Sequence, residues 1–562
     1  MMWSRIQKIL RHPAFHIFIF ILLIALAYEN SITNSFVSDD RWIRNHLPND
    51  IKTIMAMNPT IHLHQILWWL IFQFFGKTPW PYRLLNICSH TGCTILVYGI
   101  VRRIIGKRVA FLASAVFAVH PILIESVVWI AGGVYTQYTF LFLVSFYLYL
   151  LGDETTRVRE KEGDTKAHRF RPIVQRLLFL GSLITYGLCI LFSEKAIGLF
   201  LIFIAYEANR RTFRKNWKRL VPFIAIGFLF VLYYFTLVGG RLTGVAHTIG
   251  KTRVSMFNPL IQLPLAYSMY FQLMSWPHKL SFYQSELFFS LLNYGVRIFV
   301  FLGFLAGWIF CFIKRNKLFL WLSWFIIGLL PVSTPFQVAW IVAERYVYIS
   351  AIGIFVLFAI FYNRLLCVKR FRKPLVALFA LIILALVVRT VYRNTDWHNE
   401  DTLWTATQLT APSSPYTWNN MGDVYYRRED WEKAIASFRR SIALSKSYAP
   451  PYYNLANVME RTGNIGDAIL LYQKALALDP DLWGTHRQLA NIYAYKGDFM
   501  SARGEVEEAL KYEPNDPELK HNLTVLIQVL EDPTYQSKHG GSGLDIMANS
   551  VFETIIATDE DN

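Results

Sequence analysis

The sequence is poor in cysteine and in charged residues. Its five cysteines, Cys88, Cys93, Cys189, Cys311 and Cys367, lie in or beside apolar segments, and no two of them have the CxxC spacing. This pattern indicates neither a disulfide framework nor a zinc site. Charged residues make up only 17% of the 562 residues, whereas hydrophobic residues make up 54%. Together with a mean hydropathy of +0.31, this composition excludes a single soluble domain and indicates a polytopic membrane protein.

A cleavage site is also lacking near the N-terminus. Residues 1–11 are basic and lead into the apolar run 16–27, as in a signal peptide. No small-residue motif follows convincingly, so the run is expected to remain as a signal anchor.

The net charge of +17 would suit a nucleic-acid partner only if the basic residues formed one surface. They lie instead in short loops between apolar segments, for example at 102–103, 107–108 and 369–373. This is the positive-inside pattern of membrane proteins. The charge therefore indicates topology, and no nucleic-acid partner is expected.

Apolar segments long enough to cross a membrane recur along the first 392 residues. They predict about eleven spans, near residues 14–30, 82–101, 109–120, 135–151, 176–193, 196–207, 220–238, 294–313, 318–333, 348–366 and 374–391. The apolar segment 254–280 contains three prolines and is expected to be interfacial or re-entrant rather than a span. If the N-terminus is cytoplasmic, an odd number of spans places everything after residue 391 on the non-cytoplasmic side.

A repeat replaces the apolar runs after Trp397. Trp418, Tyr452 and His486 are spaced by 34 residues, and parallel rows contain small residues (Gly422, Ala456 and Ala490; Ala434, Ala468 and Ala502) or large ones (Phe438, Tyr472 and Val506). This period is typical of tetratricopeptide repeats, in which the small residues let the two helices of a repeat approach. Residues 400–409 are expected to form a half repeat, and 517–531 a closing helix.

These patterns predict an all-α chain of three parts. Residues 1–392 form a membrane helix bundle, 393–532 form a tetratricopeptide-repeat α-solenoid, and 533–562 form an acidic tail that is expected to be disordered.

Polar residues collect at the outer ends of the predicted spans. They are Asp39, Asp40, His120, Glu125, Glu194, Lys195, Glu344, Arg345, Arg393 and Asp396. A carboxylate at that depth can act as general base for an acceptor hydroxyl or as ligand to a divalent cation such as Mg²⁺ or Mn²⁺. Asp39 and Asp40 are therefore the catalytic candidates, and the metal candidates as well. Cations such as Lys195, Arg345 and Arg393 could neutralise a leaving phosphate, which suits a lipid-phosphate substrate.

Structural alternatives exist for several of the polar candidates. The acid pair could be a solvated loop, and Glu194–Lys195 and Glu344–Arg345 could be ion pairs at helix ends. His90 and His120 could be core histidines whose nitrogens are satisfied by protein groups.

Several stretches resemble the family of transmembrane and tetratricopeptide-repeat containing O-mannosyltransferases and its prokaryotic relatives. They are 36–40 with Asn45, 82–90, 118–132, 276–282, 343–349, 393–397 and the repeats, which occur in the family's order. The chain departs from the family pattern at Gly132–Tyr135, where the family has an arginine and an acid, and at Glu194–Lys195, where the order of the two residues is reversed.

The resemblance implies a C-type glycosyltransferase fold and a polyprenyl-phosphate sugar as donor. By similarity, Asp39 or Asp40 would deprotonate an acceptor hydroxyl, Glu344 and Arg345 would line the donor phosphate pocket, and His120 and Glu125 would shape its wall. His90, Glu194, Lys195 and Arg393 are further substrate-binding candidates.

The expected function is transfer of a sugar, mannose being the candidate, to a protein Ser or Thr hydroxyl that the repeats recruit. The expected location is a prokaryotic plasma membrane, with the repeats on the non-cytoplasmic side. Two alternatives remain open: the same chemistry on a lipid-linked or envelope glycan, and a non-enzymatic membrane-anchored repeat scaffold.

Overall fold

The computed structural model describes residues 12–40, 61–162, 171–250, 259–285, 290–333 and 342–531. Within these ranges the chain is helical and contains no strand, as the sequence predicted. It divides into two compact units, Met1–Ala411 and Pro412–Asn562. The predicted tail and Asn45 lie outside the described residues.

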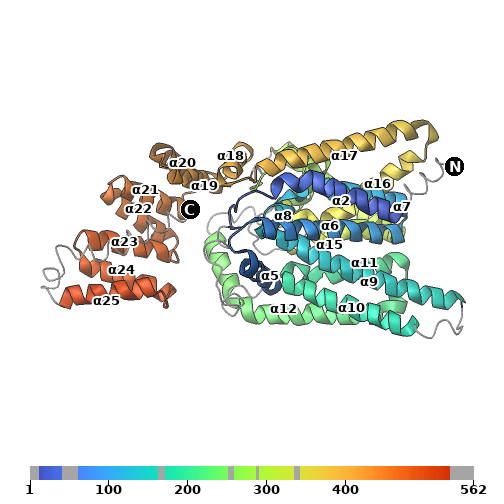
Figure 1. Ribbon diagram of the computed structural model, residues 1–562, viewed down its shortest axis with the longest axis horizontal. Helices are drawn as coiled ribbons and strands as arrows, with labels where there is room; N and C mark the ends of the chain where they lie inside the picture. The colour runs from blue at the N-terminus through green and yellow to red at the C-terminus, as the bar shows by residue number, and fades with distance from the viewer. Residues whose placement is uncertain are drawn as a thin grey trace. The chain divides into compact units, whose positions relative to one another are not determined.

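The first unit is a bundle of long helices (Figure 1). Its α-helices are α2 (Pro13–Tyr28), α5 (His62–Phe75), α6 (Trp80–Ile104), α7 (Lys107–Val119), α8 (Ile124–Val127), α9 (Val134–Glu162), α10 (Arg171–Phe192), α11 (Phe200–Arg210), α12 (Phe213–Gly250), α13 (Pro259–Ser275), α14 (Leu291–Ile313), α15 (Phe319–Leu329), α16 (Tyr348–Leu366), α17 (Arg372–Thr395) and α18 (Glu400–Thr410). Four 3₁₀ turns matter for the site: η2 (Pro121–Leu123), η3 (Ala131–Gly133), η5 (Glu194–Leu199) and η7 (Glu344–Val347).

Eight helices in the described ranges are long and apolar enough to cross a membrane, or up to nine if the bent pair 107–119 and 121–127 counts as one span. The chain is thus a multi-pass membrane protein. The eight coincide with predicted spans, on α2, α6, α9, α10, α12, α14, α16 and α17. Two predicted spans are shorter than expected: α15 has 11 residues, and 196–207 divides between η5 and the 11-residue α11. Pro-containing α13, with 17 residues, is not among the spans, and α5 is a short apolar helix that the sequence did not predict.

Close approach of helices explains much of the first unit's core. A side chain at Gly353 of α16 would overlap the carbonyl oxygen of Trp321 on α15, and one at Gly328 would overlap Ser350. Trp321 and Trp324 are fully buried where these two helices meet. Glycine at both positions therefore permits the contact that fixes the start of α16, directly after η7.

The second unit consists of helix pairs, as the period of 34 predicted. The helices are α19 (Pro415–Arg427), α20 (Trp431–Leu444), α21 (Pro450–Arg461), α22 (Ile465–Leu478), α23 (Trp483–Tyr495), α24 (Phe499–Tyr512) and α25 (Pro517–Glu531). A side chain at Gly422 would overlap the ring of Phe438, which is 1% exposed. The small residue on one helix thus leaves room for the aromatic residue on the next, and α25 closes the array at the predicted residues.

Helix α18, which the sequence assigned to the repeats as a half repeat, falls within the unit that ends at Ala411. Its cap is regular: Asn399 accepts a hydrogen bond from Thr402 N at 2.9 Å, and Thr402 Oγ1 accepts one from Asn399 N at 3.1 Å. Glu400 in its first turn lies close to the acid pair described below.

Candidate functional site

The loop that follows α2 is held by a buried arginine on α6. Arg83 is fully buried and donates to four carbonyl oxygens: those of Asn34 (2.7 Å), Val128 (2.9 Å), Ser35 (3.1 Å) and Ile32 (3.3 Å). Hydrogen bonds from a charged donor are stronger than neutral ones. Arg83 therefore fixes the backbone immediately before the two acids.

Asp40 is buried at the end of this loop. Its Oδ1 accepts a hydrogen bond from Ala131 N at 2.8 Å, and its Oδ2 accepts one from Val37 N at 3.4 Å. Burial raises the pKa of Asp40 to about 7, although these bonds and the charge of Arg83 oppose the rise. Asp40 therefore ties the acidic loop to η3 and has its oxygens directed at the protein.

Asp39 is exposed, in contrast to its neighbour. Loss of hydration raises its pKa above the usual value, the charge of Arg345 lowers it, and the charge of Glu400 raises it. The turn before it is strained, because Ser38 has a φ of +54°, a left-handed conformation that costs a non-glycine residue about 1–2 kcal/mol. A hydrogen bond of 2.5 Å from Ser38 N to Glu400 Oε1 helps hold this turn.

Arg345 interacts electrostatically with Asp39 and forms an ion pair with Glu125. Its backbone N donates to Glu125 Oε2 at 2.8 Å, and its guanidinium pairs with Glu125 Oε1. The guanidinium also lies over the rings of Tyr346 (5.0 Å to the centroid) and Trp129 (5.4 Å). These contacts orient a cation beside an exposed carboxylate.

Two tyrosines, Tyr135 and Tyr346, lie between Arg345 and the neighbouring pair Glu194 and Lys195. Lys195 Nζ is 2.7 Å from Glu194 Oε1 and lies 5.7 Å from the ring centroid of Tyr135. That ring is 6.1 Å from the ring of Tyr346, which neighbours Arg345. Both charged side chains remain partly exposed, and the two tyrosine rings connect the ion pair to Arg345.

Glu344 and Arg393 form a second, buried pair, each 1% exposed. Glu344 Oε1 accepts from Ser281 N at 2.6 Å and lies 3.7 Å from the guanidinium of Arg393. Arg393 also pairs with Asp396 at 2.7 Å. Glu344 Oε2 has no hydrogen-bond partner within the described part of the chain. The pair joins the segment after α13, η7 and the end of α17.

The two predicted histidines have both ring nitrogens in contact with protein groups. His90 lies 2.7 Å from Tyr348 Oη and 3.1 Å from the carbonyl oxygen of Ala118. His120 lies 2.9 Å from the carbonyl oxygen of Met274 and accepts from Ile122 N at 3.2 Å. This geometry favours the alternative in which both are core histidines that connect helices.

The departure from the family pattern at Gly132–Tyr135 has a structural counterpart. A side chain at Gly133 would overlap the amide of Asn86. That amide donates to the carbonyl oxygen of Trp129 at 3.2 Å and accepts from Gln137 Nε2 at 3.0 Å, and Gln137 Oε1 lies 2.6 Å from His64 Nδ1. A buried polar network therefore occupies the space beside η3.

No group of three or more His, Cys, Asp or Glu side chains that could hold a metal ion occurs in the ranges that the structure describes. Both oxygens of Asp40 face backbone N–H groups. A role of Asp39 or Asp40 as ligand of a divalent cation stays a prediction.

Sequence reasoning missed Arg83, Tyr135 and Glu400 as parts of this region. For Arg83 a signal was present, since a charged residue inside an apolar segment is costly and usually has a specific role. Tyr135 and Glu400 carry no such signal, because only the tertiary fold brings them to the acidic loop.

Two protein O-mannosyl-transferases are similar in sequence to this chain. The chain is 25% identical over 403 residues to Protein O-mannosyl-transferase TMTC4 of Homo sapiens, covering 62% of the chain and 52% of that protein. It is 23% identical over 377 residues to Protein O-mannosyl-transferase TMTC3 of Mus musculus, covering 61% and 40%. The chain is related to these O-mannosyl-transferases. This finding confirms the predicted resemblance, although the chain spans about half the length of these relatives or less.

The repeat assignment is confirmed separately, because a family model for the tetratricopeptide repeat matches residues 413–481. Among solved structures, ArnT from Cupriavidus metallidurans bound to undecaprenyl phosphate aligns with 84% of this chain and 80% of its own, at 13% identity and a TM-score of 0.37. A score at this level carries no argument about the site.

Proposed function

We propose that the chain is a membrane glycosyltransferase that moves a sugar, with mannose as the candidate, from a polyprenyl-phosphate donor to a protein Ser or Thr hydroxyl. The observation that carries the proposal is one exposed acid, Asp39, beside the oriented cation Arg345, in a chain related to protein O-mannosyl-transferases. A C-type glycosyltransferase fold is part of the proposal.

In the proposed reaction, Asp39 accepts the proton of the acceptor hydroxyl as general base. The hydroxyl oxygen forms a bond to the anomeric carbon on the face opposite the leaving group, and the bond between that carbon and the phosphate oxygen breaks. The polyprenyl phosphate leaves with the electron pair, so the configuration at the anomeric carbon inverts.

Asp40 and Arg345 have different roles in this scheme. Asp40 accepts hydrogen bonds from Ala131 and Val37 and therefore positions Asp39 rather than meeting substrate. Arg345 is placed to stabilise negative charge that develops on the leaving phosphate. Lys195 and the Glu344–Arg393 pair are proposed to bind or position the donor.

The repeats are proposed to recruit the acceptor protein, because arrays of this kind present concave surfaces to peptides. We propose a multi-pass location in a prokaryotic plasma membrane with the repeats on the non-cytoplasmic side.

Transfer of labelled mannose from a synthetic polyprenyl-phosphate mannose to a peptide mixture tests the function directly. We expect labelled peptide with the full chain and none with Asp39→Asn. A Lys314→Gln variant, which changes a charge at the far end of α14, is the matched control and should retain activity. Labelling of lipid-linked glycan instead of peptide would contradict the protein acceptor, and no transfer from any donor by folded protein would contradict the enzyme.

A further inference from the structure

The backbone directly before Asp39 has a strained conformation at Ser38. The φ of Ser38 is +54°, in the left-handed region that glycine adopts freely and other residues adopt at a cost. Strain of this kind persists only where surrounding contacts hold it, and at a functional site it commonly serves the mechanism. The groups that hold Ser38 are therefore candidates for a role in the reaction.

Glu400, in the first turn of α18, holds this conformation. Its Oε1 accepts a hydrogen bond from Ser38 N at 2.5 Å, and its Oε2 accepts one from the indole N–H of Trp404. A charged acceptor forms a stronger hydrogen bond than a neutral one. Glu400 is only 7% exposed, and both of its oxygens have partners. Its carboxylate is thus oriented to keep the Ser38 N–H in one direction.

The acidic loop contacts the segment before α18 at a second point. Ser35 N donates to the carbonyl oxygen of His398 at 2.8 Å. Val37 N, which lies between the two contacts in the sequence, donates to Asp40 instead. Residues 398–400 therefore hold the loop on both sides of residue 37, directly before Asp39.

Helix α18 is itself anchored to other parts of the first unit. At its end, Thr410 Oγ1 lies 2.8 Å from Ser281 Oγ, and Ser281 N donates to Glu344. In its middle, the buried ring of Trp404 lies 5.5 Å from the ring of Phe282. Glu400 is thus presented to the loop by a helix that is fixed along its length.

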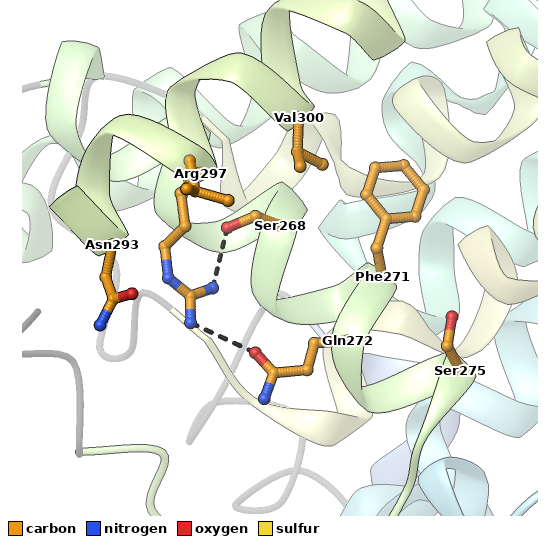
Figure 2. A pocket seen from close by; sticks show the side chains of 8 residues that line it. Ser268, Phe271, Gln272, Ser275, Asn293, Arg297 and Val300 are labelled. Carbon is orange, nitrogen blue, oxygen red and sulfur yellow. Dashed lines mark hydrogen bonds between the residues drawn. The ribbon is translucent and has the colours of Figure 1, made fainter.

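The segment that contacts α18 follows α13, and α13 is fixed as well. Tyr270 Oη lies 3.1 Å from the carbonyl oxygen of Ala343. Figure 2 shows Arg297 of α14 donating to Ser268 Oγ at 3.0 Å and to Gln272 Oε1 at 3.2 Å, both on α13. The support of α18 therefore continues into the membrane helices.

We propose that Glu400 is a positioning residue for the reaction: by holding Ser38 in its left-handed conformation, it directs the Asp39 carboxylate towards the acceptor hydroxyl. This inference rests on the function proposed above, in which Asp39 is the base. Glu400 also acts on Asp39 through its charge, as Arg345 does with the opposite sign. The test must therefore separate the contact with Ser38 from the charge.

Two substitutions make this separation. Glu400→Asp keeps the charge but shortens the side chain by one methylene, which withdraws the carboxylate from Ser38 N. Glu400→Gln removes the charge but keeps an acceptor oxygen at the same reach. We expect kcat to fall by about 5–30-fold in Glu400→Asp, the population equivalent of the cost of a left-handed conformation at a non-glycine residue, while KM for the donor stays unchanged. Glu400→Gln should retain more activity than Glu400→Asp.

Glu432 provides the matched control. It is an exposed acid in the first turn of α20, so Glu432→Asp makes the same shortening at the same position of a helix. It should leave kcat unchanged.

Glycine at position 38 tests the route from Glu400 to Asp39, because glycine adopts the left-handed conformation without a partner to hold it. Ser38→Gly should restore kcat in Glu400→Asp. A role of Glu400 in the folding of α18 alone would not be repaired in this way. If Glu400→Asp does not fold, Ser38→Val takes its place, since a β-branched residue disfavours a positive φ, and it should lower kcat.

Hydrogen exchange of residues 35–40, measured by mass spectrometry, tests the contact without any reaction. We expect faster exchange in Glu400→Asp than in the wild type, because the Ser38 N–H loses its acceptor. Unchanged exchange, wild-type kcat in Glu400→Asp, or a loss of kcat that Ser38→Gly does not restore would overturn the inference. Faster exchange in a chain whose wild type transfers no sugar would support the contact and overturn the proposed function, so the two failures are distinguishable.

Discussion

Replacing Arg83 with lysine should destabilise the first unit and reduce activity together. The guanidinium holds four carbonyl oxygens at 2.7–3.3 Å, and a lysine ammonium, with one nitrogen, is unable to reach all of them. A hydrogen bond from a charged donor contributes about 1.5–3 kcal/mol, so the loss of two bonds costs about 3 kcal/mol or more. Because Asp39 follows the anchored backbone, we also expect kcat to fall by about 10–100-fold.

The assay compares thermal unfolding and sugar transfer for Arg83→Lys and Arg102→Lys. Arg102 lies on the same helix α6 but is exposed, so the matched substitution should leave both quantities unchanged. The reasoning is refuted if Arg83→Lys unfolds at the same temperature as Arg102→Lys, since the four carbonyl contacts would then contribute nothing. Unchanged transfer with reduced stability would refute only the positioning of Asp39.

Three further predictions concern pH and packing. The pKa of Asp40 rises from 3.8 in the unfolded chain to about 7 in the folded one. Its contribution to the free energy of unfolding is therefore fully present below pH 4 and is lost as the pH rises through 7, by up to about 1.4 kcal/mol per pH unit. Asp40→Asn should remove this pH dependence of the unfolding free energy, measured by urea unfolding. The pKa of Asp39 is also raised, so transfer that needs its charged form should decline on acidification at a higher pH than 3.8, and a flat pH–rate profile would contradict its role as base. Gly133→Ala should cost about 1–3 kcal/mol in thermal unfolding because the new methyl overlaps Asn86, whereas Gly187→Ala, which meets nothing within 4 Å, should not.

The sequence predicted those features that rest on periodicity. The period of 34 located the repeats, and apolar length located eight spans, because burial patterns of helices are written locally in the sequence. The lengths of α15 and α11 were not predicted correctly from the sequence, since a short apolar helix can be stabilised by neighbouring helices that lie far away in the sequence. The sequence alone could not decide whether His90 and His120 bind substrate or are core histidines. Their hydrogen-bonding partners, Tyr348 and Met274, lie 258 and 154 residues away in the sequence.

The acid pair illustrates the same limit within the candidate site. Asp39 and Asp40 are adjacent acids, and the sequence offers both as general base and as metal ligand without showing which residue has which role. Their difference arises from Ala131 and Arg83, which approach Asp40 from other parts of the chain, and from Arg345, which approaches Asp39. Tertiary contacts thus separate an exposed carboxylate from a buried one that secures the loop.

The most direct test of this account measures transfer and thermal stability side by side for Asp39→Asn and Asp40→Asn. The account predicts that Asp39→Asn abolishes transfer from polyprenyl-phosphate mannose while it unfolds at the wild-type temperature, and that Asp40→Asn changes stability and its pH dependence while retaining measurable transfer. Full activity in Asp39→Asn would contradict the assignment of the exposed carboxylate as the base.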